Sequence, residues 1–183
     1  MILIKPILYA EDDPNDVFFM QRAFKQAGIV NPLHIVTNGS LAIDYLAGSG
    51  PYASREENPL PCPVLLDLKM PGKSGLDVLK WIRQQPGMAL PVVILTASAE
   101  EADIAAAYRL GANGFLTKPC EAGKLEDLVR AIKEFWLTHN LLPEGSATVL
   151  PRETMISGFT AELPASAERK AREGQPCRVE VIA

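Results

Sequence analysis

The sequence of 183 residues predicts an α/β fold in which a parallel sheet of five strands is covered by helices on both faces. Two observations carry this prediction. Short aliphatic runs without polar alternation are typical of strands that are buried on both faces. Segments with the apolar spacing of helices alternate with these runs, which is the arrangement of successive βαβ units. With 48% hydrophobic residues, the chain can also bury a sizeable core.

Five short apolar runs are expected to form the strands, because each is bounded by charged or turn-forming residues. They comprise residues 7–10, 33–37, 64–67, 91–96 and 115–117. The third run is aliphatic until it ends on one carboxylate, Asp67, and a Met-Pro-Gly turn follows at residues 70–72. In an open parallel sheet this end of a strand lies at the edge where ligands bind.

A helix is predicted after each strand. Pro14 and the acids around it favour the start of the first helix, and Gly28 ends it. The second helix opens at residues 38–40, and Ser74 can cap the third. Residues 48–62, which are rich in glycine, proline, serine and charge, are expected to form a long surface loop.

The fourth helix is expected to start within residues 98–101, which match the capping-box pattern, and to stop at Gly111. The apolar residues of the fifth helix are Leu125, Leu128, Val129, Ile132, Phe135 and Trp136. Because adjacent residues on a helix point about 100° apart, Phe135 and Trp136 cannot both face the sheet. We therefore expect one of them to contribute to a dimer or partner surface.

Residues 1–142 are expected to form this single domain, and residues 143–183 a C-terminal tail that is mostly irregular or disordered. The tail contains four prolines and no sustained period. It is too short and too poorly patterned to be a DNA-binding module, and only residues 177–181 alternate as a short edge strand would.

The composition excludes several classes of function. A net charge of −4 gives no basic surface for nucleic acid or an anionic membrane. No apolar run approaches the roughly 20 residues that span a bilayer, and the N-terminus does not have the pattern of a signal peptide. The three cysteines, Cys62, Cys120 and Cys177, are scattered and indicate free thiols in a reducing cytoplasm. We therefore expect a cytoplasmic protein that binds neither nucleic acid nor membrane.

Polar side chains stand at the ends of four of the five predicted strands. Glu11 and Asp12 follow the first strand, Asp67 ends the third, Thr96 ends the fourth and Lys118 follows the fifth. The carboxyl ends of parallel strands share one edge of the sheet. A flavodoxin-like strand order of 2-1-3-4-5 would gather these residues into one pocket at the point where the order reverses.

This group of residues suits phosphoryl transfer. Clustered carboxylates repel one another, and Mg²⁺ relieves the repulsion because it prefers oxygen ligands. Asp67 could then attack a phosphoryl group and become an acyl phosphate, with the hydroxyl of Thr96 and the ammonium of Lys118 on the phosphate oxygens. Each residue also has a plain structural interpretation: helix-start acids, a strand-end threonine, a surface lysine. Four such coincidences at four strand ends make the joint chemical interpretation the stronger one.

The segments at residues 9–13, 65–72, 94–98 and 111–119 together resemble the receiver domain of two-component response regulators. The resemblance covers residues 1–142. The long loop before the third strand, together with residues 134–137, is more similar to the small single-domain regulators that partner bacterial phytochrome kinases.

The resemblance implies a role for each site residue. Asp67 would be the phosphoacceptor. Asp12 and Asp67 would bind Mg²⁺ directly, with the main-chain carbonyl of Lys69 as a third protein ligand. Glu11, which stands where aspartate is commoner, would act through a water molecule because its side chain is longer. Asp13 lies just past the acidic pair and has no metal role.

A second set of residues is implied to carry the response. Thr96 and Phe115 would form a switch pair, in which the hydroxyl moves toward the phosphate and the ring turns inward. That change would reshape the face made by the fourth helix, fifth strand and fifth helix. Lys118 would pair with the phosphoryl group, and the Lys118–Pro119 peptide bond is expected to be cis.

The leading hypothesis is a signalling module that accepts a phosphoryl group on Asp67 from a sensor histidine kinase, expected from the finer resemblance to be a phytochrome. It would not be an enzyme beyond slow self-dephosphorylation, and it would signal to an unknown downstream protein or as a homodimer. One alternative is a Mg²⁺-dependent phosphatase of the haloacid-dehalogenase type. Such enzymes carry Asp-x-Asp after the first strand, whereas Glu11 stands in the nucleophile's place here. A second alternative is a pseudo-receiver that binds a partner without phosphorylation, which the complete set of acids disfavours.

Overall fold

The computed structural model describes residues 4–141, in which five parallel strands form one sheet with the order β2-β1-β3-β4-β5. This order confirms the predicted flavodoxin-like topology. The strands are β1 (Ile7–Ala10), β2 (Leu33–Val36), β3 (Val64–Leu66), β4 (Val92–Thr96) and β5 (Gly114–Thr117). The predicted tail and the edge strand at residues 177–181 lie outside the described residues.

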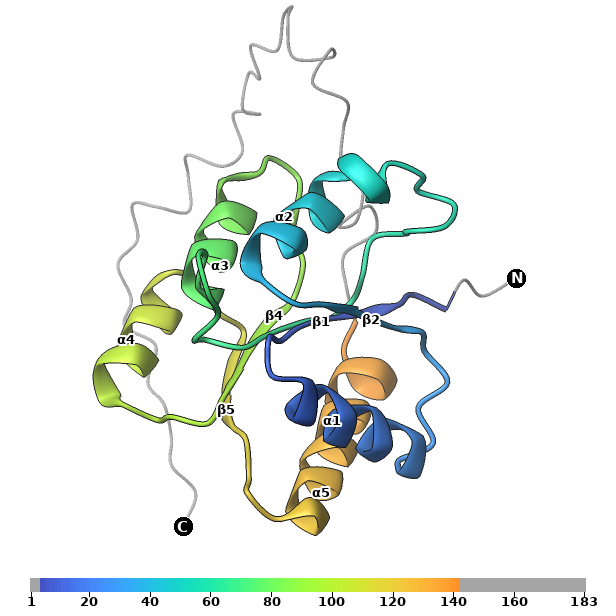
Figure 1. Ribbon diagram of the computed structural model, residues 1–183, viewed down its shortest axis with the longest axis vertical. Coiled ribbons are helices and arrows are strands. Elements are labelled where there is room, and N and C mark those ends of the chain that lie inside the picture. The colour runs from blue at the N-terminus through green and yellow to red at the C-terminus, as the bar shows by residue number, and fades with distance from the viewer. Residues whose placement is uncertain (1–3, 142–183) are drawn as a thin grey trace, which may run out of the picture. The chain divides into compact units, whose positions relative to one another are not determined.

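Helices follow the strands in strict alternation. They are α1 (Pro14–Gln26), α2 (Gly39–Ala47), α3 (Gly75–Gln84), α4 (Glu101–Arg109) and α5 (Ala122–Ile132), together with a 3₁₀ turn at Gly50–Tyr52. Figure 1 shows α1 and α5 on one side of the sheet and α2, α3 and α4 on the other. None of the helices between residues 4 and 141 has both the length and the apolar character that a membrane crossing requires.

The helices bury both faces of the central strands. On β1, Leu8 packs into the core under α2 and α3, whereas Ile7 packs into the core under α1 and α5. The residues of β3 follow the same alternation, and every residue of β1, β3 and β4 is buried. This burial explains the unbroken aliphatic runs that predicted the strands, because neither face of these strands meets water.

The start of α4 differs from the prediction. The helix begins at Glu101 after an N-cap at Glu100 that makes no side-chain capping bond, so the capping box expected at residues 98–101 was wrong. The backbone N–H of Ser98 donates instead to the Thr96 hydroxyl at 3.4 Å. Residues just beyond β4 therefore belong to the loop at the sheet edge.

The last helix also departs from the prediction of one continuous α-helix. The winding changes after Ile132, and Lys133–His139 form a π-helical segment. Trp136 packs against the α1/α5 core, whereas the side chain of Phe135 is 56% exposed. As expected, the two rings do not both face the core, although they contact each other edge to face with centroids 4.7 Å apart. The use of one ring in a dimer or partner surface stays a prediction.

Polar groups fix the N-terminal end of β5 to its neighbours. Asn113 accepts at its side-chain oxygen from the backbone of Val92 at 2.9 Å and from the guanidinium of Arg83 at 2.7 Å. The same guanidinium donates to the carbonyls of Leu90 and Gly111. The side chain of Arg83 thus ties the end of α3 to the loops that lead into β4 and β5.

The first turn of α3 lies tightly against the end of β3. Ser74 caps the helix as predicted, in a capping box with Asp77. Gly75 follows at the first helical position, where a Cβ atom would lie 2.2 Å from the backbone oxygen of Asp67. Only glycine allows this approach.

Because a Gly75→Ala substitution must push α3 away from Asp67, we expect it to lower the free energy of unfolding by roughly 1–3 kcal/mol. The measurement is urea unfolding followed by circular dichroism. Gly123→Ala is the matched control, since Gly123 lies in α5 with no atom within 4 Å of the added Cβ. We expect the control to keep or slightly raise the stability. Equal stability of the two variants would contradict the close approach.

Candidate functional site

The carboxyl edge of the sheet brings together the acidic residues that the sequence singled out. Glu11 directly follows β1, and Asp67 follows β3 with its backbone N–H bonded to Ala10 at 2.9 Å. Glu11 and Asp67 are 2% and 5% exposed, so both carboxyl groups are largely withdrawn from water. Asp12 is exposed at the rim beside them.

Lys118 lies at the centre of this acidic group. Its backbone N–H donates to the carbonyl of Thr96 at 2.7 Å, which holds the end of β5 against β4. Its ammonium forms ion pairs with Glu11, with Asp16 at 2.8 Å and with Asp67 Oδ1 at 2.9 Å. The side chain of Lys118 is only 10% exposed, so these contacts form in a site with little water.

Tyr9 supports the acidic group from within the sheet. This fully buried β1 residue donates its phenol hydroxyl to Glu11 Oε2 at 2.7 Å. Burial, followed by the charge of Glu11, raises the pKa of Tyr9 above its ordinary value. The phenol is therefore a permanent donor to the carboxylate.

The pKa shifts show which effects dominate. Burial raises the pKa of Glu11 above its ordinary value, although hydrogen bonds from Lys118 and Tyr9 act in the opposite direction. Burial by itself lowers the pKa of Lys118, but hydrogen bonds to Asp16, Glu11 and Asp67 outweigh it and raise that pKa. The lysine is therefore firmly charged, and its single charge does not fully compensate the buried Glu11 carboxylate.

Three carboxylates are placed to share a cation. Glu11, Asp12 and Asp67 each offer one oxygen, and these oxygens all lie within 4.8 Å of one another. An oxygen-only set of this kind fits a hard divalent cation such as Mg²⁺. The predicted metal group is therefore brought together, while the main-chain carbonyl of Lys69 and the route through water at Glu11 stay predictions.

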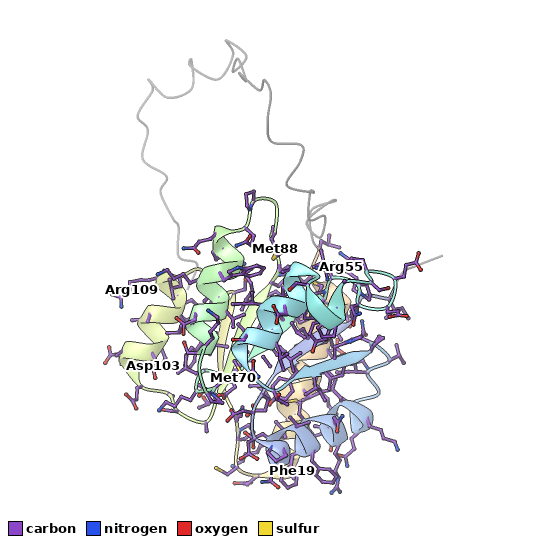
Figure 2. All side chains as sticks on the ribbon, turned by 45° about the horizontal axis from the view of Figure 1, so that its top comes forward. Phe19, Arg55, Met70, Met88, Asp103 and Arg109 are labelled. Carbon is purple, nitrogen blue, oxygen red and sulfur yellow. The ribbon has the colours of Figure 1, made fainter. Side chains whose placement is uncertain are left out.

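The backbone after β3 orients the side chain of Asp67. The N–H of Lys69 donates to Asp67 Oδ2 at 2.7 Å, and Lys118 occupies Oδ1. Met70, which is labelled in Figure 2, lies in the turn that follows Asp67 and is 7% exposed. It packs into the core under α2 and α3 and so anchors this turn. Both Asp67 oxygens thus have fixed hydrogen-bond donors, which set the direction of the carboxylate.

The two predicted switch residues share one face of the sheet. Thr96 ends β4 and is 1% exposed. It lies two residues after Ile94, so both side chains are on the side of the sheet covered by α2, α3 and α4. Phe115 lies beside Ile94 in the β4–β5 register and packs against the same core, half-buried. The hydroxyl and the ring are therefore both on the side of α4, as a coupled pair requires.

A cleft of about 230 Å³ opens beside the ammonium of Lys118, between α1 and the segment that leads into α5. Its lining includes Asp16, Phe19 and Cys120. Figure 2 shows Phe19 on the outer side of α1, where its side chain is 43% exposed. The cleft therefore opens onto Asp16 and Lys118 from the side of α1.

The predicted cis bond between Lys118 and Pro119 was wrong. Within residues 4–141 the cis bond is Cys62–Pro63, and the Lys118–Pro119 bond is trans. The two isomers of an X–Pro bond differ little in free energy, so tertiary packing decides between them rather than the dipeptide itself.

Two residues of the site were not predicted from the sequence, Tyr9 and Asp16. Tyr9 stood in the first strand and in the segment at residues 9–13 but had no predicted role, and Asp16 was not singled out among the acids near the start of the first helix. A tyrosine two residues before Glu11 lies on the same side of an extended strand, which is the signal that could have linked them. The contact between Asp16 and Lys118 joins residues 102 positions apart and had no local signal.

Comparisons with known proteins agree with this geometry. A family model described as the response regulator receiver domain matches residues 7–130. The response regulator Rcp1 of Synechocystis sp. is 39% identical over 140 residues, which cover 76% of this chain and 93% of Rcp1. A probable methanogenesis regulatory protein of Methanothrix harundinacea, FilR2, is 36% identical over 141 residues, which cover 75% of this chain and 86% of the relative.

Two solved structures are similar over nearly their whole length. The phosphorylated cyanobacterial phytochrome response regulator RcpA is 35% identical, with a TM-score of 0.70, and the match covers 77% of this chain and 99% of RcpA. The Mn²⁺-bound form of Rcp1 is 38% identical, with a TM-score of 0.68, and the match covers 76% of this chain and 99% of Rcp1. Fold, site and sequence therefore agree that this chain belongs to the response regulator receiver domain family.

Proposed function

We propose that this chain accepts a phosphoryl group on Asp67 from the phosphohistidine of a sensor histidine kinase. The observation that carries the proposal is the setting of the Asp67 carboxylate. It is buried at the carboxyl edge of the sheet, with Lys118 on one oxygen and the N–H of Lys69 on the other. A carboxylate held in this way is directed as a nucleophile rather than solvated as a surface acid.

In the transfer step, an oxygen of Asp67 forms a bond to phosphorus while the bond between phosphorus and the imidazole nitrogen of the donor breaks. The ammonium of Lys118 is already 2.9 Å from Asp67 Oδ1 and can donate to a phosphoryl oxygen. Tyr9 holds Glu11 in place, and Glu11 in turn holds Lys118. These residues position charge in advance of the reaction.

The proposed cofactor is Mg²⁺, held by Asp12 and Asp67 directly and by Glu11 through water. When bound, it would supply the positive charge that the acidic group lacks. The oxygen-only set of Glu11, Asp12 and Asp67 supports this proposal. The Mn²⁺-bound form of the relative Rcp1 supports a divalent cation in general.

The proposed activity is that of a phosphoacceptor with at most slow self-dephosphorylation, rather than that of a phosphatase. The input side of the proposal is a phytochrome kinase. Its support is the similarity to the phytochrome response regulator RcpA and to a response regulator in red light signalling of R. palustris, which is 31% identical with a TM-score of 0.71.

The proposed output is a change of the face formed by α4, β5 and α5. Phosphorylation would draw the Thr96 hydroxyl toward the phosphoryl group, and Phe115 would turn into the space that it leaves. A downstream protein or a second copy of the chain would read the altered face. Phe135 follows α5 and is 56% exposed, beside the loops that lead into β4 and β5. Its exposure supports a contact surface at the C-terminal end of α5.

The first test is the mass of the intact protein after incubation with acetyl phosphate. We expect wild type with Mg²⁺ to gain the mass of one phosphoryl group, because Asp67 provides one acceptor. Omission of Mg²⁺ or the substitution Asp67→Ala should abolish the gain. A gain that persists in Asp67→Ala would place the acceptor elsewhere and contradict the proposal.

A second prediction concerns the cation. Asp12→Asn should weaken Mn²⁺ binding about tenfold or more, because it removes one charged ligand from the set. Isothermal titration of the protein with Mn²⁺ measures this. Asp13→Asn is the matched control: it removes an adjacent carboxylate while keeping the N-cap of α1. Similar losses of Mn²⁺ affinity in both variants would show that the affinity depends on negative charge in general and not on Asp12 as a ligand.

A third prediction tests the switch. Phosphorylated wild type should show amide chemical-shift changes in Gly114–Thr117 and Glu101–Arg109, and phosphorylated Thr96→Ala should show much smaller changes, because the coupling hydroxyl is missing. Thr117→Ala, which removes a hydroxyl from the residue paired with Thr96, is the control. Shift changes of equal size in Thr96→Ala and wild type would exclude Thr96 as the coupling residue.

A further inference from the structure

Asp16 contributes the one carboxylate at the Lys118 ammonium that comes from a helix. It stands in the first turn of α1, and its Oδ2 lies 2.8 Å from Lys118 Nζ. The start of α1 is itself fixed, because Asp13 caps it by accepting from the N–H of Asn15 at 2.8 Å. An acid in a first helical turn favours the helix dipole, but that role needs no contact with a lysine across the site.

The hydrogen bonds of the ammonium can be counted. A lysine ammonium has three N–H donors, and three carboxylates surround this one: Glu11, Asp16 and Asp67. Every donor therefore has a partner. When a phosphoryl oxygen takes the donor that now faces Asp67, the contacts with Glu11 and Asp16 are the two that can keep the ammonium in place.

Of those two contacts, Asp16 has no competing role. Glu11 belongs to the group of three carboxylates whose oxygens lie close enough to share a cation, and it also accepts from Tyr9. Asp16 is not in that group. A divalent cation would compete with Lys118 for the oxygens of Glu11 and Asp67 but not for those of Asp16.

We propose that Asp16 is a positioning residue that holds the ammonium of Lys118 at the phosphoacceptor site before and during phosphoryl transfer. The inference rests on the proposed function of Asp67. Lysine has a flexible stem of four carbons, so an ammonium without a lateral partner samples more positions and is less often in reach of the phosphoryl oxygen. Asp16 restricts that motion from the side of α1.

The sign of the kinetic effect separates this role from simple electrostatics. Removal of a negative charge near a site that receives an anionic phosphodonor should, by charge alone, speed phosphorylation. Loss of a positioning contact should slow it. Asp16→Asn is therefore expected to react more slowly with acetyl phosphate than wild type, by roughly three- to fivefold, the range of a partly exposed ion pair. Asp13→Asn removes a charge from the same rim, keeps the cap and should react no more slowly than wild type.

The contact itself can be measured without metal or phosphoryl donor. In ¹⁵N-labelled protein, the rate at which the ammonium protons of Lys118 exchange with water is read from the Nζ signal, assigned by its loss in Lys118→Gln. Three hydrogen bonds and burial should make this exchange slow in wild type and in Asp13→Asn. Asp16→Asn should exchange several-fold faster. Urea unfolding of both variants confirms that each is folded.

Each outcome decides a different point. Faster proton exchange together with slower phosphorylation in Asp16→Asn alone supports the inference. Unchanged exchange, or no slow Lys118 signal in wild type, overturns the contact. Faster exchange with an unchanged or increased phosphorylation rate overturns the positioning role. Failure of wild type to form any adduct overturns the proposed function of Asp67, and with it the role of Asp16 in transfer, independently of the exchange measurement.

Discussion

The cost of burying carboxylates of like charge is the constraint that the site must satisfy. Glu11 and Asp67 are almost fully removed from water, and Asp12 lies beside them. Two donors stabilise the Glu11 carboxylate, the ammonium of Lys118 and the phenol of Tyr9, yet burial still keeps the pKa of Glu11 above its ordinary value. At Glu11 the effects that stabilise the carboxylate are therefore outweighed by the cost of burying it, whereas at Lys118 the contacts with carboxylates outweigh burial. A site in that balance gains most from one more positive charge, which is the physical basis for assigning it a divalent cation.

The same constraint links distant parts of the chain. Lys118 follows β5, but its ammonium contacts residues at the ends of β1 and β3 and in the first turn of α1. The lysine can reach them because its backbone N–H is bonded to Thr96, which sets the end of β5 against β4. One side chain thus depends on four elements of the sheet edge and one helix. Asp67 and the end of β5 thus share one partner, because the lysine whose ammonium pairs with Asp67 is also bonded to Thr96 through its backbone.

The sequence was sufficient to predict the features that depend on the alternation of strands and helices along the chain and on the residues at the strand ends. Aliphatic runs placed β1, β3 and β4, and the strand order placed Glu11, Asp67, Thr96 and Lys118 at one edge. Features that depend on tertiary packing were missed or wrong. The capping pattern at residues 98–101 gave way to a loop tied to Thr96, and the isomer of Lys118–Pro119 was decided by the fold. Asp16 was indistinguishable in sequence from an acid that favours a helix start.

The anchoring of β5 limits how a signal can leave the site. At the N-terminal end of β5, Asn113 exchanges hydrogen bonds with the backbone of Val92, and at the C-terminal end Lys118 is bonded to Thr96. A strand fixed at both ends resists sliding as a unit, since sliding would break both sets of bonds. Phe115 lies between the two anchors, only half-buried, whereas β1, β3 and β4 are fully buried. A side-chain rearrangement at Phe115 would therefore break none of the hydrogen bonds that hold β5 at its two ends.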